Sequence, residues 1–176
     1  MADDLSLTEW TVLGVLAEAP RHGFAVAREL ADDAPLGQVW TVPRPLVYRA
    51  IGRLADDGLV EAVRAEEGDR GPTRTVHRVT RTGRRRYRCW LDAPVGHPRD
   101  VRTELLAKLV LRKRAGVPSG PLVRAQREHF APVAAGLARA ARRAEGPDRI
   151  VARWRLESIR AVERTLTAIA ADDQRG

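Results

Sequence analysis

The stretch Thr41-Val-Pro-Arg-Pro-Leu-Val-Tyr-Arg-Ala-Ile-Gly-Arg-Leu-Ala-Asp-Asp-Gly-Leu-Val60 contains the signals that start and end a helix. Pro43 and Pro45 suit a first helical turn, where no backbone N–H donor is needed. Gly58 suits the position just after a helix, where a positive φ is favoured. The stretch therefore predicts one helix with defined ends.

This helix has an apolar face and a basic face. Val47, Ile51 and Leu54 recur at spacings of three and four residues, so they share the face that packs inward. Arg49 and Arg53 lie four residues apart and fall together on another face. A short helix that presents arginines on one side is typical of a nucleic-acid recognition helix.

Two extended segments follow the helix and predict a β-hairpin. The first runs from Leu59 to Glu67 and the second from Thr73 to Thr80, and Gly68-Asp-Arg-Gly71 lies between them. Glycines at a turn permit conformations that other residues avoid. A helix followed directly by a hairpin is the winged helix-turn-helix pattern, so the sequence predicts a DNA-binding fold.

Two further helices are expected before this unit. Ser6-Leu-Thr-Glu9 is a capping-box pattern and opens a helix that reaches about Glu18. A second helix is expected over residues 23–33, and Pro35-Leu36-Gly37 is expected to end it. Trp40-Thr-Val-Pro43 is then a short entry segment, for which a small strand is one possibility.

The remainder of the chain is predicted to be helical. A helix is expected over 80–91, and the Pro/Gly-rich segment 92–98 marks a domain boundary. The prediction is a mainly α protein, with a winged helix-turn-helix domain at 1–92 and a helical domain at 99–173. Helices are expected over 99–115, from Ser119 or Gly120 to Ala144, and over 148–171.

The two last helices carry apolar stripes at spacings of three and four residues, which is typical of helix packing. One stripe runs from Val123 to Ala144 and the other from Ile159 to Ile169. Pro132 lies inside the first and is expected to kink it or remove a hydrogen bond. The pair is expected to form a homodimer; the alternative is an intramolecular hairpin that caps the head.

The charge of the chain favours an anionic partner. The net charge is +8, but residues 1–92 carry 14 basic and 14 acidic side chains, so the excess lies in the second half. Within the first half, residues 70–90 contain eight arginines and no acid. A local patch, and not the net charge of the head, would therefore bind DNA.

Several classes of protein and site are disfavoured. Cys89 is the single cysteine, the four histidines lack close spacing, and no apolar run approaches 18 residues. No glycine-rich phosphate loop or nucleophile-elbow motif is present. We therefore expect a cytoplasmic, nucleoid-associated protein with no cofactor, no metal and no enzymatic activity.

Six residues are the candidates for DNA contact, because they lie on the basic helix or in the hairpin. Tyr48 either binds a phosphate or packs in the head, and the arginines either contact DNA or form a solvated face. Arg49 is expected to contact bases and Arg74 to contact phosphates. The candidates are Arg44, Tyr48, Arg49, Arg53, Arg70 and Arg74.

The tryptophans are most simply anchors of a core or an interface. Three of them could instead line a cavity for a flat aromatic effector. These candidate effector-binding residues are Trp40, Trp90 and Trp154.

Several segments of the chain form an ordered set of motifs: Leu5–Leu16, Arg21–Leu30, Val47–Leu54, Gly58–Val60, Val76–Thr80 with Gly83, Trp90-Leu91 and Glu104–Leu109. Their order and spacing resemble the PadR family of bacterial transcriptional regulators. Phe24 and His77 stand where the family usually has tyrosine. The resemblance implies a winged-helix head, a helical dimerisation domain and, usually, repression.

The function predicted from these features is that of a homodimeric regulator of transcription. It would repress from a palindromic operator on double-stranded DNA and be released by a small aromatic or drug-like effector. The alternative is an architectural or RNA-binding basic protein without an effector. An enzyme with a winged-helix appendage is a third class, but the 84 residues after position 92 are few and helical.

Overall fold

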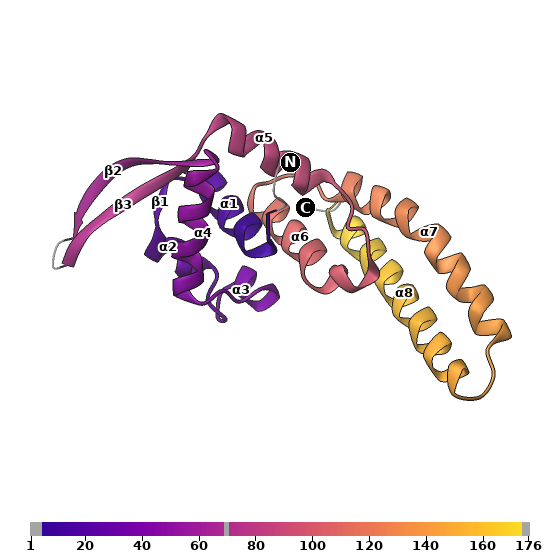
Figure 1. Cartoon of the computed structure of the whole chain (residues 1–176). Coiled ribbons are helices and arrows are strands. Elements are labelled where there is room, and N and C mark those ends of the chain that lie inside the picture. Colours follow the sequence, from indigo (N-terminus) through magenta and orange to yellow (C-terminus); the bar gives the residue numbers. More distant parts are fainter. Residues whose placement is uncertain (1–4, 69–70, 174–176) are drawn as a thin grey trace. The chain divides into compact units, whose positions relative to one another are not determined.

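The computed structural model describes residues 5–68 and 71–173, and most of them are helical (Figure 1). The chain divides into two compact units. The first contains the residues up to Leu91 together with Leu106–Ala115; the second contains Asp92–Leu105 and the residues from Gly116 onward. The segment Leu106–Ala115, which the sequence analysis placed in the helical domain, thus belongs to the first unit.

The first unit is a winged helix. Its sheet is antiparallel in the order β1-β3-β2, and the long β2/β3 hairpin forms the wing (Figure 1). The mainly helical fold class with a winged helix-turn-helix head is confirmed. Its elements are α1 (Leu7–Glu18), β1 (Arg21–His22), α2 (Gly23–Glu29), α3 (Pro35–Val39), α4 (Arg44–Asp56), β2 (Val60–Gly68), β3 (Gly71–Val79) and α5 (Arg81–Asp92).

The local signals that bound α1 and α4 take the predicted form. The Ser6 backbone N–H donates to Glu9 Oε2 at 2.6 Å and the Glu9 N–H donates to Ser6 Oγ at 3.4 Å, which is the capping box. Gly58 has a φ of 66°, as expected for the residue after a helix. The N–H of Leu59 donates to the Leu54 carbonyl at 2.8 Å and closes that end.

Thr80 and Gly83 fix the junction between the wing and α5. The Thr80 Oγ1 accepts a hydrogen bond from the Gly83 N–H at 3.1 Å and so satisfies a donor in the first turn of α5. A Cβ at Gly83 would collide with the carbonyl oxygen of Leu59. The glycine therefore allows α5 to approach the start of the wing.

The core of the first unit joins α1, α2, α4, the sheet and α5. Each large aliphatic side chain buried there contributes about 1.5–3 kcal/mol of transfer free energy. Leu111, which is distant in sequence, belongs to the same cluster, and a Cβ at Gly14 would lie 2.9 Å from its Cδ1. Other members of the cluster are Val12, Leu13, Leu16, Val26, Leu30, Leu36, Val47, Ile51, Leu54, Leu59, Tyr87, Trp90 and Leu91.

Polar contacts also hold Leu106–Ala115, which forms most of α6 (Glu104–Arg114), in the first unit. Arg114 pairs with Glu18 at 2.7 Å and with Glu29 at 2.8 Å. These two carboxylates raise the pKa of the Arg114 guanidinium. The ammonium of Lys108, which is 1% exposed, lies 4.8 Å from the centroid of the Trp90 ring. The segment is therefore an integral part of the head.

The segment between α2 and α4 differs from the prediction. The second helix ends at Glu29 instead of residue 33, and residues 35–37, expected to break it, instead begin α3. Pro35 occupies the start of that helix, a position that suits proline because no donor is lost. Residues 41–43, for which a small strand was one possibility, have no regular structure.

The start of the helix expected over 99–115 also differs. Pro98–Arg102 form a 3-10 helix, η1, and α6 begins at Glu104. Thr103 lies between them with a ψ of −78°, and its N–H donates to the Asp100 carbonyl at 3.4 Å. The expected single helix is therefore divided.

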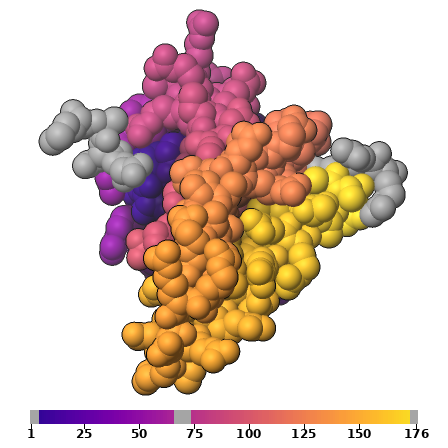
Figure 2. Space-filling view, turned by 90° about the vertical axis from the view of Figure 1, so that its right-hand side faces the viewer, coloured from indigo at the N-terminus to yellow at the C-terminus, as the bar shows by residue number. Residues whose placement is uncertain are grey.

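The main part of the second unit is a hairpin of two long helices, α7 (Gly120–Arg143) and α8 (Gly146–Asp173), which lie side by side (Figures 1 and 2). Gly146 makes the turn with a φ of 50°. Phe130 of α7 and Ile159 and Leu166 of α8 are buried. No helix among residues 5–68 and 71–173 is long and apolar enough to cross a membrane.

Gln126 of α7 forms hydrogen bonds to Val95 in the segment before η1. Its amide is fully buried; Oε1 accepts from the Val95 N–H at 2.7 Å and Nε2 donates to the Val95 carbonyl at 3.0 Å. Both polar ends of a buried amide are thereby satisfied. The polar residue in the predicted apolar stripe thus has a structural partner.

Candidate nucleic-acid interface

Helix α4 separates an inward apolar face from an outward polar face. Val47, Ile51 and Leu54 are buried in the core of the first unit. The four candidate residues of this helix are all exposed: Arg44, Tyr48, Arg49 and Arg53. The helical spacing thus produces the division into faces that the sequence predicted.

The Arg44 and Tyr48 side chains lie over the start of α2. The guanidinium carbon of Arg44 is 5.0 Å from the centroid of the Phe24 ring and 5.8 Å from that of Tyr48. A Cβ at Gly23 would lie 2.6 Å from Cε1 of Tyr48, so glycine is needed for the tyrosine ring to pack there. Two side chains of α4, Arg44 and Tyr48, thus pack against the His-Gly-Phe segment at the start of α2.

Arg74 of the wing strand β3 reaches the same aromatic ring. Its guanidinium carbon lies 5.4 Å from the Phe24 centroid. These side chains line a pocket of about 500 Å³, which we call the Phe24 pocket. None of the lining residues is acidic: His22, Gly23, Phe24, Arg44, Tyr48, Arg74, Thr75 and His77. The fold therefore brings together three candidates from two elements, Arg44 and Tyr48 from α4 and Arg74 from β3.

The two histidines of the Phe24 pocket have different roles. His22 accepts a hydrogen bond from the Ala25 N–H on its Nδ1 at 3.0 Å and so caps α2. His77 has a buried Nδ1 without a hydrogen-bond partner among the described residues. Burial lowers the pKa of His77 from its usual value of 6.5, which favours the neutral ring at pH 7.

Arg53 and Arg49 differ in their surroundings. Arg53 Nη1 lies 3.2 Å from Glu9 Oε1, whose side chain is only 7% exposed. The pair links α4 to the capping box of α1, because Glu9 also accepts from Ser6. Arg49 is exposed on the helix. Arg53 thus has a structural role as well as its predicted role in DNA contact.

A comparison with family models identifies the first unit. Residues 12–89 match the model described as the transcriptional regulator PadR-like family. These residues are a PadR-like domain. Over these residues the resemblance noted in the sequence is confirmed, and the family is one of transcriptional regulators and not of enzymes.

Solved structures similar to the chain include three bacterial proteins. Bacillus subtilis PadR, solved in complex with operator DNA, has a TM-score of 0.49 and 19% identity, with 96% of this chain and 99% of that chain covered. The protein smu.1604c of Streptococcus mutans UA159 has a TM-score of 0.45 and 16% identity, with 93% and 98% covered. The Vibrio cholerae virulence activator AphA has a TM-score of 0.42 and 23% identity, with 95% and 97% covered. A comparison with curated proteins gives no match.

The arginine run over residues 70–90 includes the candidate Arg70 and several arginines of α5. Arg70 lies outside the described residues. On α5, Arg84 donates to the Ala17 carbonyl at 3.1 Å, and the Arg86 guanidinium carbon lies 5.9 Å from the Trp10 centroid. Part of the arginine run after the wing is therefore used in packing α5 against α1.

The three candidate effector-binding tryptophans have different environments. Trp40 is half-buried and donates from Nε1 to Thr8 Oγ1 at 3.1 Å. Trp90 is buried and stacks on Trp10, with ring centroids 5.1 Å apart. Trp154 of α8 is 69% exposed. Trp40 and Trp90 belong to the first unit and Trp154 to the second.

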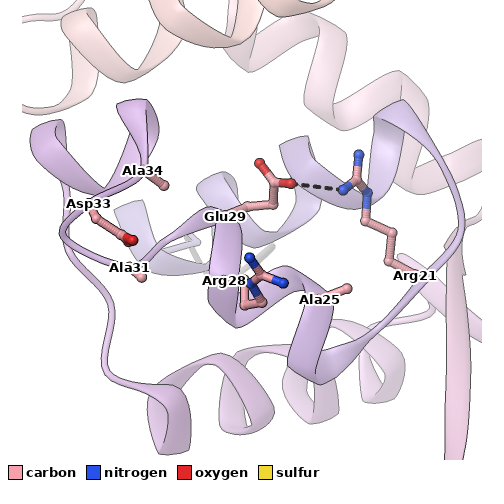
Figure 3. Close-up of a pocket in the computed structure, with 7 residues that line it drawn as sticks. All are labelled: Arg21, Ala25, Arg28, Glu29, Ala31, Asp33 and Ala34. Carbon is pink, nitrogen blue, oxygen red and sulfur yellow. Dashed lines mark hydrogen bonds and ion pairs between the residues drawn. The ribbon is translucent and has the colours of Figure 1, made fainter.

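A second pocket on the PadR-like domain has a different charge. It has a volume of about 550 Å³ and is lined by Arg21, Ala25, Arg28, Glu29, Ala31, Asp33 and Ala34 (Figure 3). Arg21 pairs with Glu29 at 3.0 Å inside it. Since acidic and basic groups are mixed here, this pocket attracts an anion less than the Phe24 pocket does.

Sequence reasoning missed His22, Phe24 and His77 as members of the Phe24 pocket. Arg21 pairs with His77 and His22 with Val76 across β1 and β3, and β1 was not predicted. The His-Gly-Phe motif was the available signal. Among the residues that the structure describes, no three His, Cys, Asp or Glu side chains are grouped as a metal site.

Proposed function

We propose that this PadR-like protein is a sequence-specific, homodimeric repressor that is released from a palindromic operator by a small aromatic or drug-like effector. The observation that carries the DNA-binding part is the exposed arginine face of α4 beside the acid-free Phe24 pocket, which also holds an arginine of the wing. Recognition helices contact base edges while flanking groups hold phosphates. Such a regulator would act in the cytoplasm, at the chromosome.

Within this proposal the DNA contacts have separate tasks. Arg49, exposed on α4, contacts base edges in the major groove, where arginine pairs well with guanine. Arg44, Tyr48 and Arg74 contact the phosphate backbone, since they surround one acid-free pocket. Arg53 and Arg70 add further contacts to the phosphate backbone.

The homodimer would form through the second unit. Helix α8 exposes three apolar side chains close together, Ile150 at 74%, Val151 at 50% and Trp154 at 69%. Burial of a large apolar side chain contributes about 1.5–3 kcal/mol. A dimer in which a second copy covered these three side chains would therefore be strongly stabilised. Two heads held about 34–36 Å apart would then meet successive major grooves on one side of the duplex.

Release by an effector requires a ligand that favours the DNA-free arrangement. A tenfold loss of operator affinity needs about 1.4 kcal/mol of differential binding. The coupling is reciprocal, so bound DNA must reduce the affinity for the effector by the same factor. Trp40, Trp90 and Trp154 provide fluorescent reporters for a flat aromatic ligand.

The test is to select duplexes from a random pool with the full chain and footprint the product. We expect protection of one palindrome and a mass from light scattering that corresponds to two chains. Expression from a promoter that contains this palindrome should fall when the protein is present. A uniform footprint on all duplexes, or stronger binding to RNA, would instead support the architectural or RNA-binding alternative suggested by the net charge of +8.

A further inference from the structure

The Phe24 pocket holds two cations around a single aromatic ring. Arg44 comes from the recognition helix and Arg74 from the wing, and their guanidinium carbons lie 5.0 and 5.4 Å from the Phe24 centroid. Two like charges held around one ring repel each other. The attraction of each cation to the face of the ring is the contact that keeps them there.

An anion would relieve this repulsion. The residues that line the pocket include no aspartate or glutamate, while they include donors of a kind that suits phosphate. Guanidinium groups bind phosphate through paired N–H donors, and the exposed Tyr48 carries a phenolic O–H. The lining is therefore complementary to a phosphate group and not to a cation.

Stacking on Phe24 also reduces the entropic cost of binding. A free arginine side chain loses rotamer freedom when it is ordered on DNA. Arg44 and Arg74 are already oriented by the ring, so less of that freedom remains to be lost. Phe24 itself is half-buried at the start of α2. The Tyr48 ring packs against Gly23, the residue before it.

We propose that the Phe24 pocket binds one phosphate of the DNA backbone and that Phe24 is the positioning residue that presents Arg44 and Arg74 to it. This inference rests on the proposed function. It assigns a role to a residue that does not itself carry charge. It also couples α4 to the wing, because both contribute to the same phosphate.

The experiment uses the full chain and the duplex selected above. Phe24→Leu removes the ring and Phe24→Tyr keeps it; thermal unfolding of each variant verifies that the head is folded. We expect Phe24→Leu to reduce the affinity of the protein for the duplex roughly tenfold and to reduce the salt dependence of binding. Phe24→Tyr should restore affinity to within about twofold, since a phenol ring also attracts cations.

A double-mutant cycle gives the second readout. Once Phe24→Leu is present, Arg44→Ala and Arg74→Ala should each cost less than in the wild type, because their positioning is already lost. Arg28→Ala in the pocket of Figure 3 is the matched control and should leave affinity unchanged. Additive effects would overturn the inference, and so would equal losses for Phe24→Leu and Phe24→Tyr.

The remaining outcomes separate the two proposals and the two sources of phosphate. A wild type that protects no duplex overturns the proposed function; a wild type that does, with Phe24→Leu equal to it, overturns only the inference. Inorganic phosphate is added as a competitor while NMR follows the Phe24 and His77 rings. Ring shifts produced by phosphate alone and not by the duplex would assign the pocket to a free anion, against the inference.

Discussion

The PadR-like head and the α7/α8 hairpin leave different chemistries exposed. The head buries the apolar side of α4 and presents arginines and a tyrosine to solvent. Helix α8 buries Ile159 and Leu166 but leaves Ile150, Val151 and Trp154 exposed. A charged face suits an anionic partner in water, whereas a group of exposed large apolar side chains suits a second protein surface. The two units therefore point to two kinds of partner.

Disrupting the apolar surface should give the largest effect. Trp154→Glu places a charge where we expect a second copy, so the dimer should dissociate. Each protein molecule should then contact only one of the two operator half-sites. Operator affinity should fall on the order of a hundredfold or more. Light scattering and operator titration measure the two consequences. Thr165→Glu, exposed on the same helix, is the control; a Trp154→Glu protein that remained dimeric would assign dimerisation to another surface.

On the head, Arg49→Ala and Arg74→Ala should differ in kind. A base-contacting arginine costs about 1–3 kcal/mol and relaxes sequence preference when removed. A phosphate-contacting arginine weakens all duplexes alike and lowers the salt slope by about one. We assign the first behaviour to Arg49 and the second to Arg74. Titrations of operator variants at several salt concentrations measure both, and identical behaviour would show that the roles of helix and wing are misassigned.

Sequence reasoning succeeded where the signal is local. Helix α4, its end at Gly58 and the capping box of Ser6 and Glu9 each depend on neighbours within a few residues. The prediction of a break at residues 35–37 was wrong because Pro35 can either end one helix or begin the next. Only the packing of Leu36 in the core decides between the two. Local signals thus fix elements better than the boundaries between them.

The His-Gly-Phe motif is a sequence signal for the Phe24 pocket, but the sequence could not show which residues of other elements meet it there, because that depends on tertiary contacts. Phe24, Arg44 and Arg74 come from α2, α4 and β3, and no spacing in the sequence indicates that they meet. The segment Leu106–Ala115 is a similar case. Its apolar residues fit any helix-packing surface, whereas its place in the head depends on Leu111 and on the pairs of Arg114 with Glu18 and Glu29.

Arg53→Ala tests whether all arginines of α4 serve DNA alone. Its loss leaves the nearly buried Glu9 carboxylate without this ion pair. Because Arg53 is 43% exposed, solvent screening limits the cost to about 1 kcal/mol of unfolding free energy. Thermal denaturation should show a lower midpoint for Arg53→Ala and an unchanged one for Arg49→Ala. Equal midpoints for both variants would remove the structural role of Arg53.

The smallest expected effect concerns pH and the head alone. Burial lowers the pKa of His77 in the folded protein below its unfolded value of 6.5. Between the folded pKa and 6.5 the unfolded chain binds more protons, so stability is complete above pH 6.5 and declines as the pH falls towards the folded pKa. His77→Gln removes this dependence. We therefore expect the unfolding free energy of the wild type to fall relative to that of His77→Gln when both are measured from pH 7.5 to 5.5. A difference that stays constant over this range would mean that His77 is as well solvated in the folded head as in the unfolded chain.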